Sequence, residues 1–153
     1  MKITLQEEIQ LLKTVSLFHT LKERELKIIT LTIENIIYEP WEVIVNEGDE
    51  GGEAYIIYTG YVEVYRKAGD GKLISLNKMG PGGMFGELAL FGNGYRTASV
   101  KAVEETLVSV LSKEKLYEII RAFPDIAIEM LKAITERFAK VENRLMRSMT
   151  HEE

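Results

Sequence analysis

Glu87 and Arg96 are the two side chains of this sequence whose types and spacing indicate ligand chemistry. An arginine guanidinium is a planar fork of donors that fits a phosphate group bidentately. A carboxylate beside a phosphate repels it unless the carboxylate binds another group, and a sugar hydroxyl is a natural partner for it. A phosphate on Arg96 and a ribose hydroxyl on Glu87 would together be parts of one nucleotide.

The backbone next to Glu87 has the composition of an anion site. Gly86 has no Cβ, so a ligand can approach the main chain closely there. Residues 87–90 are Glu-Leu-Ala-Leu, which favour one short helical turn. N–H groups at the start of such a turn have no internal acceptor and suit an anion. Two glycines, Gly92 and Gly94, separate this turn from Arg96, so we expect the site to lie within residues 82–102.

The order FGELAL, a short glycine-containing gap and then RTASVKA resembles the phosphate-binding cassette of cyclic nucleotide-binding domains. These domains occur in catabolite activator proteins, in the regulatory subunits of cyclic-AMP-dependent kinase, in cyclic-GMP-dependent kinase and in gated cation channels. The motif requires many residue types in a fixed order, and the resemblance extends from roughly Leu17 to Leu145.

The resemblance implies a role for each part of the motif. Glu87 is expected to hold the ribose 2′-hydroxyl and Arg96 to pair with the cyclic phosphate. Backbone amides near Gly86, Leu88 and Ala89 are expected to complete the phosphate cradle. The residues that the resemblance assigns to the ligand are Phe85, Gly86, Glu87, Leu88, Ala89, Arg96, Thr97 and Ala98.

The identity of the base stays open at this point. In the family, members that favour cyclic GMP often carry a threonine where this sequence has Thr97, whereas kinase subunits that favour cyclic AMP carry alanine. Channels that respond to cyclic AMP nevertheless share the run RTASV. The resemblance therefore predicts a cyclic-AMP sensor, with a sensor that prefers cyclic GMP as the alternative.

A second difference from the family concerns the long C-terminal helix. Catabolite activators contact adenine with a Thr-Ser pair on this helix. The same spacing counted from Pro124 gives Val141 and Glu142, so the hydroxyl pair is absent. Glu142 or Asn143 could accept a hydrogen bond from the adenine amino group. The alternative is that both are solvated helix residues.

Length and composition are those of one globular domain. The chain has 153 residues, 46% hydrophobic and 28% charged residues, and a formal net charge of −5. One domain of residues 1–153 is therefore expected. The acidic balance provides no general attraction for nucleic acid. No cysteine is present, so disulfides and thiolate metal sites are excluded. Neither a signal peptide nor a long apolar run occurs, which predicts a cytoplasmic protein without a membrane partner.

Residue patterns predict an α+β protein. Thr20 followed by Glu23 fits a capping box, so a helix is expected from about Lys22 to Thr32, within N-terminal helices spanning about residues 3–32. Residues 33–111 contain β-branched and aromatic runs between turn signals, which predict about eight short strands in an antiparallel, jelly-roll-like barrel or β-roll. Ser112 is expected to cap the first of two C-terminal helices, which together span about residues 112–149.

The last of these helices carries an apolar row, which we define as Ala127, Leu131, Ile134, Phe138, Val141 and Leu145. Its spacing alternates between four and three residues, as in a coiled coil. Two interpretations follow: helix 124–149 pairs with its copy in a homodimer, or it folds back on its own β-roll as a lid. The homodimer is favoured, and ligand binding is expected to be coupled to movement of this helix.

Two other functions are alternatives to a nucleotide sensor. A metal-dependent enzyme needs histidines and carboxylates around an open metal position, but His19 and His151 are the only histidines. The acidic turn at residues 47–52 lacks the ligand spacing of a calcium loop. We therefore expect no catalysis, metal or cofactor. A β-roll that binds no nucleotide and only dimerises is the other alternative, and the retained Glu87 and Arg96 argue against it.

The output of the expected sensor is not visible in the sequence. Catabolite activators continue into a helix-turn-helix domain that binds DNA. This chain reaches Glu153 without such an element, so direct DNA binding is not expected. The expected partners are a cyclic nucleotide, a second copy of the chain and an unknown effector protein.

Overall fold

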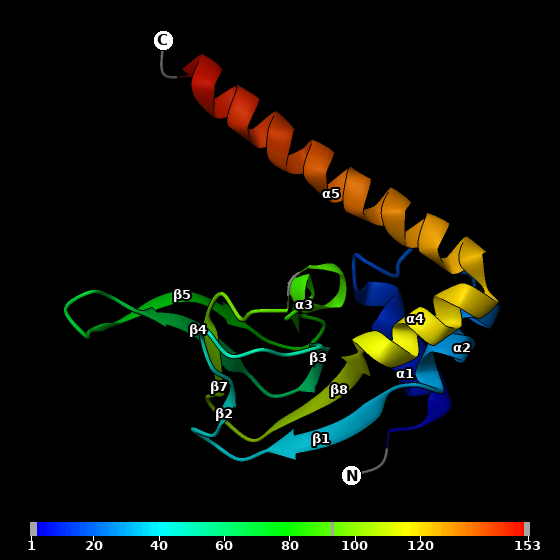
Figure 1. The fold of residues 1–153 in the computed structure, drawn as a ribbon, viewed down its shortest axis with the longest axis horizontal. Coiled ribbons are helices and arrows are strands. Elements are labelled where there is room, and N and C mark those ends of the chain that lie inside the picture. The colour runs from blue at the N-terminus through cyan, green and yellow to red at the C-terminus, as the bar shows by residue number, and fades with distance from the viewer. Residues whose placement is uncertain (1–2, 93, 152–153) are drawn as a thin grey trace.

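Two antiparallel four-stranded sheets form the centre of the fold, with helices at both ends of the chain (Figure 1). The computed structural model describes residues 3–92 and 94–151. Sheet A has the order β1-β8-β3-β6, and sheet B has the order β2-β7-β4-β5. The strands of sheet A are β1 (Glu34–Tyr38), β8 (Thr106–Ser112), β3 (Glu53–Thr59) and β6 (Met84–Phe85). The strands of sheet B are β2 (Val43–Val45), β7 (Ser99–Ala102), β4 (Val62–Lys67) and β5 (Leu73–Met79).

The α+β class and the antiparallel roll are confirmed, but the expected barrel is not closed. In the described residues each sheet keeps two edges, β1 and β6 in sheet A and β2 and β5 in sheet B. The two sheets face each other as an open roll, and β6, at one edge of sheet A, contains only two residues.

Strand β3 shows why the roll has a separate core on each side of sheet A. Successive side chains of a strand point to opposite faces. Tyr55 and Ile57 therefore lie in the core between the sheets, whereas Ala54 and Ile56 lie in a second core beneath the helices. The helical core also contains buried residues of both terminal segments, among them Ile9, Leu12, Phe18, Leu26, Ile29, Leu116, Ile126 and Met130.

The N-terminal helices α1 (Leu5–Thr14) and α2 (Glu23–Thr30) cover one face of sheet A. The predicted capping box at Thr20 and Glu23 is wrong. The N-cap of α2 is Lys22, whose N–H donates to the Glu25 carboxylate over 2.9 Å. The Thr20 hydroxyl instead donates to the carbonyl of Glu129 over 3.4 Å, so a tertiary contact uses the side chain that the sequence pattern assigned to the cap.

A buried carboxylate lies on α1. Glu8 is bonded to the side chain of Asn35, and Asn35 Oδ1 accepts a hydrogen bond from the Ser109 hydroxyl over 3.1 Å. Glu8 Oε1 is buried with no hydrogen-bond partner among the described residues. Burial raises the pKa of Glu8, because the ionised form loses its hydration.

The turn between β1 and β2 places a tryptophan in the left-handed region. Trp41 has φ of 70°, and the turn around it contains a 3.1 Å hydrogen bond from Glu42 N–H to the Glu39 carbonyl. The indole is 66% exposed and lies 5.7 Å from the ammonium of Lys101. Because the indole is largely exposed, its packing contributes little free energy to offset the backbone strain at Trp41.

The C-terminal helices are α4 (Lys113–Ala122) and α5 (Pro124–His151). Ser112 caps α4 as predicted, since its hydroxyl accepts a hydrogen bond from Lys115 N–H over 3.2 Å. The first turns of α5 pack on the body through the buried side chains of Ile126, Met130 and Ala133. Every described side chain from Ile134 to Thr150 is exposed, and the helix projects away from the roll (Figure 1).

Strand β5 is an exposed edge of sheet B in the hairpin that extends from the roll (Figure 1). Leu73, Ile74 and Leu76 are all exposed on it, with Lys72 and Lys78 nearby in the sequence. A bulge between Val64 and Tyr65 interrupts the pairing of β4 with β5.

Membrane-spanning helices and metal-ligand clusters are both absent from the described residues. None of their helices is both long and apolar enough to cross a lipid bilayer. No cluster of three or more His, Cys, Asp or Glu side chains among them could hold a metal ion.

Candidate ligand-binding site

A cavity of about 170 Å³ opens between the inner face of sheet B and residues 84–89 and 95–98. Val45, Val64 and Val100 form its apolar wall on the side of sheet B. The structure brings all eight residues that the sequence assigned to a ligand together around this cavity. These residues are Phe85, Gly86, Glu87, Leu88, Ala89, Arg96, Thr97 and Ala98.

Arg96 is the buried charge of the cavity, with 7% of its surface exposed. Its Nη1 donates to the Glu53 carbonyl over 2.9 Å, and its Nη2 lies 3.4 Å from Glu53 Oε2. The guanidinium carbon lies 5.7 Å from the centre of the Tyr55 ring, which stacks on Phe85 with 4.9 Å between ring centres. Burial is the main cause that raises the pKa of Tyr55, so this ring supports Arg96 as a neutral phenol.

Two glycines make room for the guanidinium. A Cβ on Gly51 would fall 2.3 Å from Arg96 Nη2, and a Cβ on Gly86 would fall 2.7 Å from Nη1. Gly86 also has φ of +79°, a conformation that L side chains rarely adopt. The side chain of Arg96 can therefore take its buried position only because both neighbours lack a Cβ.

The loop of residues 46–52 holds the backbone of Arg96. Arg96 N–H donates to the Asp49 carbonyl and Gly48 N–H donates to the Arg96 carbonyl, each over 2.8 Å. Gly51 N–H donates to the Gly94 carbonyl over 2.7 Å. Sequence analysis assigned this loop only a turn, since nothing in its composition indicates which distant segment it contacts.

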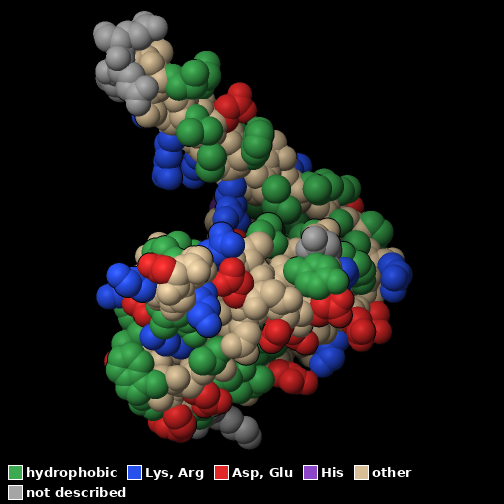
Figure 2. All heavy atoms as spheres, turned by 60° about the vertical axis from the view of Figure 1, so that its left-hand side comes forward, with side chains coloured by type: hydrophobic (Ala, Val, Ile, Leu, Met, Phe, Trp, Pro, Cys, Tyr) green, Lys and Arg blue, Asp and Glu red, His purple; other side chains and the backbone are tan. Residues whose placement is uncertain are grey.

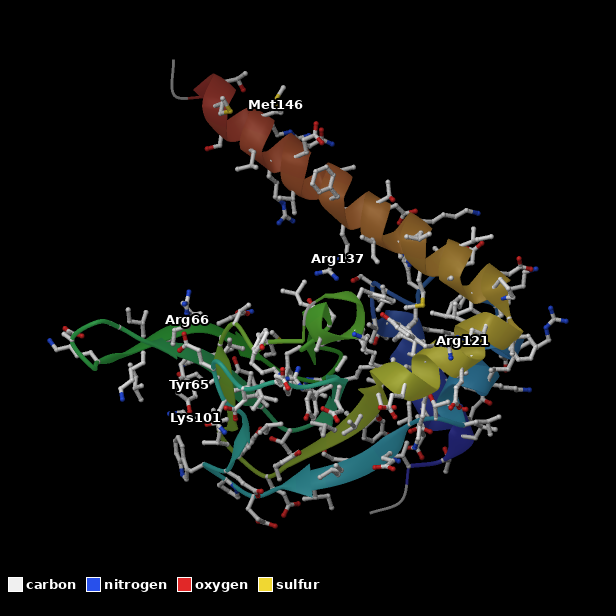
Figure 3. The ribbon with its side chains drawn as sticks, in the orientation of Figure 1. Tyr65, Arg66, Lys101, Arg121, Arg137 and Met146 are labelled. Carbon is white, nitrogen blue, oxygen red and sulfur yellow. The ribbon has the colours of Figure 1, made fainter. Side chains whose placement is uncertain are left out.

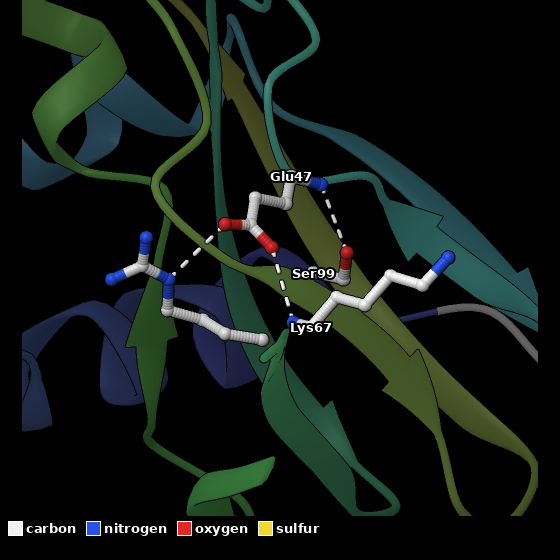
Figure 4. A network of polar contacts seen from close by, with 4 residues as sticks. Glu47, Lys67 and Ser99 are labelled. Carbon is white, nitrogen blue, oxygen red and sulfur yellow. Dashed lines mark hydrogen bonds and ion pairs between the residues drawn. The ribbon is translucent and has the colours of Figure 1, made fainter. Parts of the chain in front are cut away.

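Glu47 fixes the start of this loop to sheet B (Figure 4). Its N–H donates to the Ser99 hydroxyl over 2.8 Å. Its carboxylate accepts from Arg66 Nε over 3.1 Å and from Lys67 N–H over 3.3 Å. The backbone bond from Lys67 is the largest of the causes that lower the pKa of Glu47, so the carboxylate stays ionised and bound at neutral pH.

The short helix α3 (Leu88–Phe91) follows Glu87. Ala89 N–H donates to the Gly86 carbonyl over 3.0 Å, so this amide is already bonded within the turn. Ala89 lines the cavity, and the role of its amide in a phosphate cradle stays a prediction. Leu88 opens the helix, where an N–H has no acceptor within the helix.

Glu87 contacts the long helix α5. Its Oε1 lies 3.6 Å from Arg137 Nη2, and both side chains are partly exposed. Figure 3 shows Arg137 on α5 above α3, whereas Arg121 lies on α4 away from it. The contact between Arg137 and Glu87 was not predicted from the sequence, because β7, β8 and α4 lie between the two residues in the chain.

Helix α4 also contacts the segment that lines the cavity. The Tyr117 hydroxyl donates to the Leu90 carbonyl over 2.6 Å, and its ring lies 6.2 Å from the Phe91 ring. Lys113 N–H donates to the Gly52 carbonyl over 2.6 Å. Helix α4 therefore touches both segments that position Arg96 and Glu87.

An apolar groove of about 510 Å³ separates α3 from α5. Leu88 and Phe91 form its wall on α3, and Ile134, Phe138 and Val141 form its wall on α5. All five side chains are exposed, and Figure 2 shows apolar side chains along the projecting helix.

Glu142 and Asn143, the candidates for contact with a base, do not line the cavity. Both are exposed on the projecting part of α5. Within one copy of the chain, the structure does not bring them together with the other predicted residues.

Known proteins resemble the chain along most of its length. It is 28% identical over 136 residues to a CRP-like cAMP-activated global transcriptional regulator of Mycobacterium tuberculosis, covering 89% of this chain and 61% of the relative. It is 30% identical to the cyclic AMP receptor protein of Thermus thermophilus, covering 88% and 62% of the two proteins. The chain thus spans about three-fifths of the length of these curated relatives.

A solved structure shares the fold. The N-terminal domain of a transcriptional regulator from Streptomyces coelicolor superposes with a TM-score of 0.82 at 27% identity, covering 88% of this chain and 94% of that one. Residues 36–123, more than half of this chain, match the family model described as cyclic nucleotide-binding domain. This match includes sheet B, the cavity, α4 and all of sheet A except Glu34 and Asn35 of β1, and the chain therefore belongs to the cyclic nucleotide-binding domain family.

Proposed function

We propose that residues 1–153 act as one cyclic nucleotide sensor that binds cyclic AMP in the cavity beside Arg96. The buried guanidinium is the observation that carries this proposal. Within the described residues its hydrogen bonds go to Glu53 alone, so the fork keeps donors for an anion. A cyclic phosphate would pair with Arg96, and the ribose 2′-hydroxyl would bind the Glu87 carboxylate on the other side of the cavity.

The choice of cyclic AMP is supported by the names of both relatives, which refer to this nucleotide. Thr97 lies exposed at the edge of the cavity, where its hydroxyl can contact either the phosphate or a base. A sensor that prefers cyclic GMP is the alternative. The family is regulatory rather than catalytic, and the effector of this chain is an unidentified protein partner.

Two contacts would couple the ligand to the C-terminal helices. Tightening of the cassette around the phosphate would move α3, and α3 is bonded to α4 through Leu90 and Tyr117. A ribose on Glu87 would compete with Arg137 of α5. Leu88 would then repack against the groove. Ligand can shift α5 only by binding its two positions with different affinity.

Thermal unfolding with cyclic AMP, cyclic GMP and 5′-AMP tests the proposal. A ligand at 100 times its Kd stabilises the folded state by about 2.7 kcal/mol. For a chain of this size the melting temperature should rise by roughly 5–11 °C. We expect the largest shift with cyclic AMP and little with 5′-AMP. No shift with either cyclic nucleotide, in protein free of bound nucleotide, would leave a roll that serves only for dimerisation.

Replacing Arg96 with alanine tests the phosphate contact directly. The change removes charge-assisted hydrogen bonds and leaves the phosphate unpaired, which should weaken binding by about 2–4 kcal/mol, or roughly 30- to 900-fold. Titration calorimetry measures the loss. Arg121→Ala removes an exposed arginine from α4 and should bind like the unchanged protein. Equal affinities for the two variants would refute the role of Arg96.

A further inference from the structure

We propose that a second ligand site lies between α3, α4 and α5, and that it binds a small apolar acid, with an aliphatic or aromatic body and one carboxylate. The site is a cavity of about 460 Å³, which we call the α4–α5 cavity. It shares no lining residue with the nucleotide cavity beside Arg96. Binding of the acid stands on this cavity alone, and only its effect on the nucleotide rests on the proposed function.

The α4–α5 cavity has apolar walls from three helices. Phe91 belongs to α3, Ile120 to α4, and Ala127, Met130 and Ile134 to α5. Met130 is 2% exposed and belongs to the helical core, so the cavity reaches inward from the surface to that core. Small-molecule sites usually have volumes of about 300–1,000 Å³ and are mostly apolar with a few polar groups, and this cavity fits that description.

Arg121 supplies the charge of the α4–α5 cavity. It lies in the last turn of α4 (Figure 3) and is the one charged residue among the described residues that line the cavity. No hydrogen bond or ion pair joins its guanidinium to another residue that the structure describes. The guanidinium has only donors and fits a carboxylate bidentately. Because Arg121 is exposed, the carboxylate would stay in contact with water while the apolar body enters the cavity.

The other polar side chain of the lining is already bonded. The Tyr117 hydroxyl donates its proton to the Leu90 carbonyl over 2.6 Å, so it has no second proton for a ligand. Arg121 therefore selects the head group of the ligand. A carboxylate gains charge-assisted hydrogen bonds there, an alcohol of the same length gains only weaker ones, and an ammonium group is repelled.

A small acid fits the α4–α5 cavity better than a second copy of the chain does. Ala127, Leu131 and Ile134 of the apolar row line the cavity, so a partner helix could lie over its mouth in the predicted homodimer. The row of a second copy, however, consists of apolar side chains only and provides no acceptor for Arg121. An apolar acid matches both the walls and the charge.

Titration calorimetry with decanoate, decanol and decylamine, each below its micelle-forming concentration, tests the class of ligand. We expect one decanoate per chain, bound at least about tenfold more tightly than decanol, with decylamine weakest. Equal affinities for the acid and the alcohol would overturn the role of Arg121. Absence of binding by all three compounds would overturn the site.

Two variants of the cavity locate the bound acid. Arg121→Ala should weaken decanoate binding about tenfold, to the level of decanol. Ala127→Trp should fill the cavity and abolish binding, while thermal unfolding shows that the fold is intact. Ile128→Trp is the matched control, because it adds the same ring at an adjacent exposed position outside the lining and should leave decanoate binding unchanged. Unchanged binding in both cavity variants would refute the location.

Arg96→Ala separates the two cavities. Arg96 lines the nucleotide cavity only, so this variant should bind decanoate like the unchanged protein. Loss of decanoate binding in Arg96→Ala would place the acid beside the buried guanidinium and overturn the second site. The two arginine variants thus serve as controls for each other, since Arg121→Ala should affect only the acid and Arg96→Ala only the nucleotide.

Two further measurements distinguish other occupants from a free acid. Decanoate affinity should not depend on protein concentration. An affinity that falls as the protein concentration rises would show that a second copy covers the α4–α5 cavity. The chain should also stay in the supernatant when vesicles of phosphatidylglycerol are sedimented. Co-sedimentation that is lost in Arg121→Ala would assign this surface to a membrane. Either of these results would overturn the proposal.

The acid should also affect the nucleotide, because Phe91 of α3 forms part of the cavity wall. In the proposed function cyclic AMP moves α3, whereas an acid in the cavity would hold α3 in its present place between α4 and α5. Saturating decanoate should therefore raise the Kd for cyclic AMP about three- to tenfold, and cyclic AMP should weaken decanoate binding by the same factor. The same decanoate concentration should have a smaller effect in Arg121→Ala.

The outcomes keep the second site and the proposed function apart. Decanoate binding with unchanged cyclic AMP affinity would refute the coupling and support the site. A chain that binds decanoate in the α4–α5 cavity but no cyclic nucleotide would refute the proposed function and support the site. A chain that binds cyclic AMP but not decanoate would refute the site and support the proposed function.

Discussion

The position of Arg96 depends on glycine at position 51, because the guanidinium occupies the space where a Cβ of residue 51 would lie. We expect Gly51→Ala to push Arg96 out of position and to weaken cyclic nucleotide binding at least about tenfold, a loss of about 1.4 kcal/mol. Gly51 has no positive φ, so the effect would come from the contact and not from backbone strain.

The neighbouring glycine is the matched control for this variant. A Cβ on Gly52 would approach Lys113 Cβ at 3.7 Å, which is ordinary van der Waals contact. Gly52→Ala should therefore bind ligand like the unchanged protein. Calorimetric titration of both variants decides the point, and equal affinities would contradict the close fit of Gly51 against Arg96.

Glu8 predicts an unusual dependence of stability on pH. Burial raises its pKa in the folded state, so the folded protein holds a proton that the unfolded chain releases. The stability of the unchanged protein should then fall relative to Glu8→Gln as the pH rises above the unfolded value of about 4.3, until the folded pKa is passed. Thermal unfolding between pH 4 and 8 measures the difference.

Glu7, one residue away, should change the pH dependence of stability in the opposite direction. Hydrogen bonds from Tyr58 and Thr4 lower the pKa of Glu7. Its contribution to stability is therefore present above the unfolded pKa and is lost as the pH falls through the folded pKa. Glu7→Gln should be less stable than the unchanged protein near neutrality and should approach it in acid. Parallel pH profiles for the two variants would contradict both assignments.

The sequence predicted the residues of the site but not the contacts that support them. Glu87 and Arg96 lie close in the chain and have a recognisable order, and in the structure both line the same cavity. Glu53 is separated from Arg96 by 43 residues, and only the folding of loop 46–52 against residues 94–96 brings them together. Contacts over such distances carry no local signal in one sequence.

Among the elements, the β1–β2 turn places Trp41, a residue with a bulky side chain, in a backbone conformation that favours glycine. A residue at φ of 70° is accommodated by glycine, and any other residue pays a steric cost there of about 1–2 kcal/mol. Trp41→Gly should therefore be more stable than Trp41→Ala by about 1 kcal/mol, because both variants lose the same indole. Denaturant unfolding compares them. Equal stability would show that the backbone of this turn relaxes to negative φ.

The elements with strong local patterns were predictable. Strand β2 consists of the β-branched residues Val43, Ile44 and Val45, within the stretch of residues 33–111 that was predicted to form strands, and α5 begins at Pro124 as expected. The errors arose where tertiary contacts outweighed local preference. Thr20 makes a bond to α5 instead of capping α2. Strand β6 was missed, because two residues after a glycine-rich turn become a strand only by pairing with β3.

On the scale of the molecule, stability should be unevenly distributed along α5. Residues 126–133 are tied to the helical core, whereas no tertiary contact of the described chain holds residues 142–150. Hydrogen exchange at low protein concentration should show protected amides in the first segment and near-unprotected amides in the second. Uniform protection along the helix would mean that α5 opens only with the whole domain.

The edge of sheet B has a consequence for how this protein behaves at high concentration. Leu73, Ile74 and Leu76 make β5 an apolar strand with unpaired backbone groups, which is a template for edge-to-edge aggregation. Lys72 and Lys78 act as charged gatekeepers on either side, and the bulge in β4 keeps the hairpin from being flat. Two copies meeting at this edge would oppose their own lysines, so the repulsion that keeps the sheets apart is strongest at low salt and weakens as salt screens it.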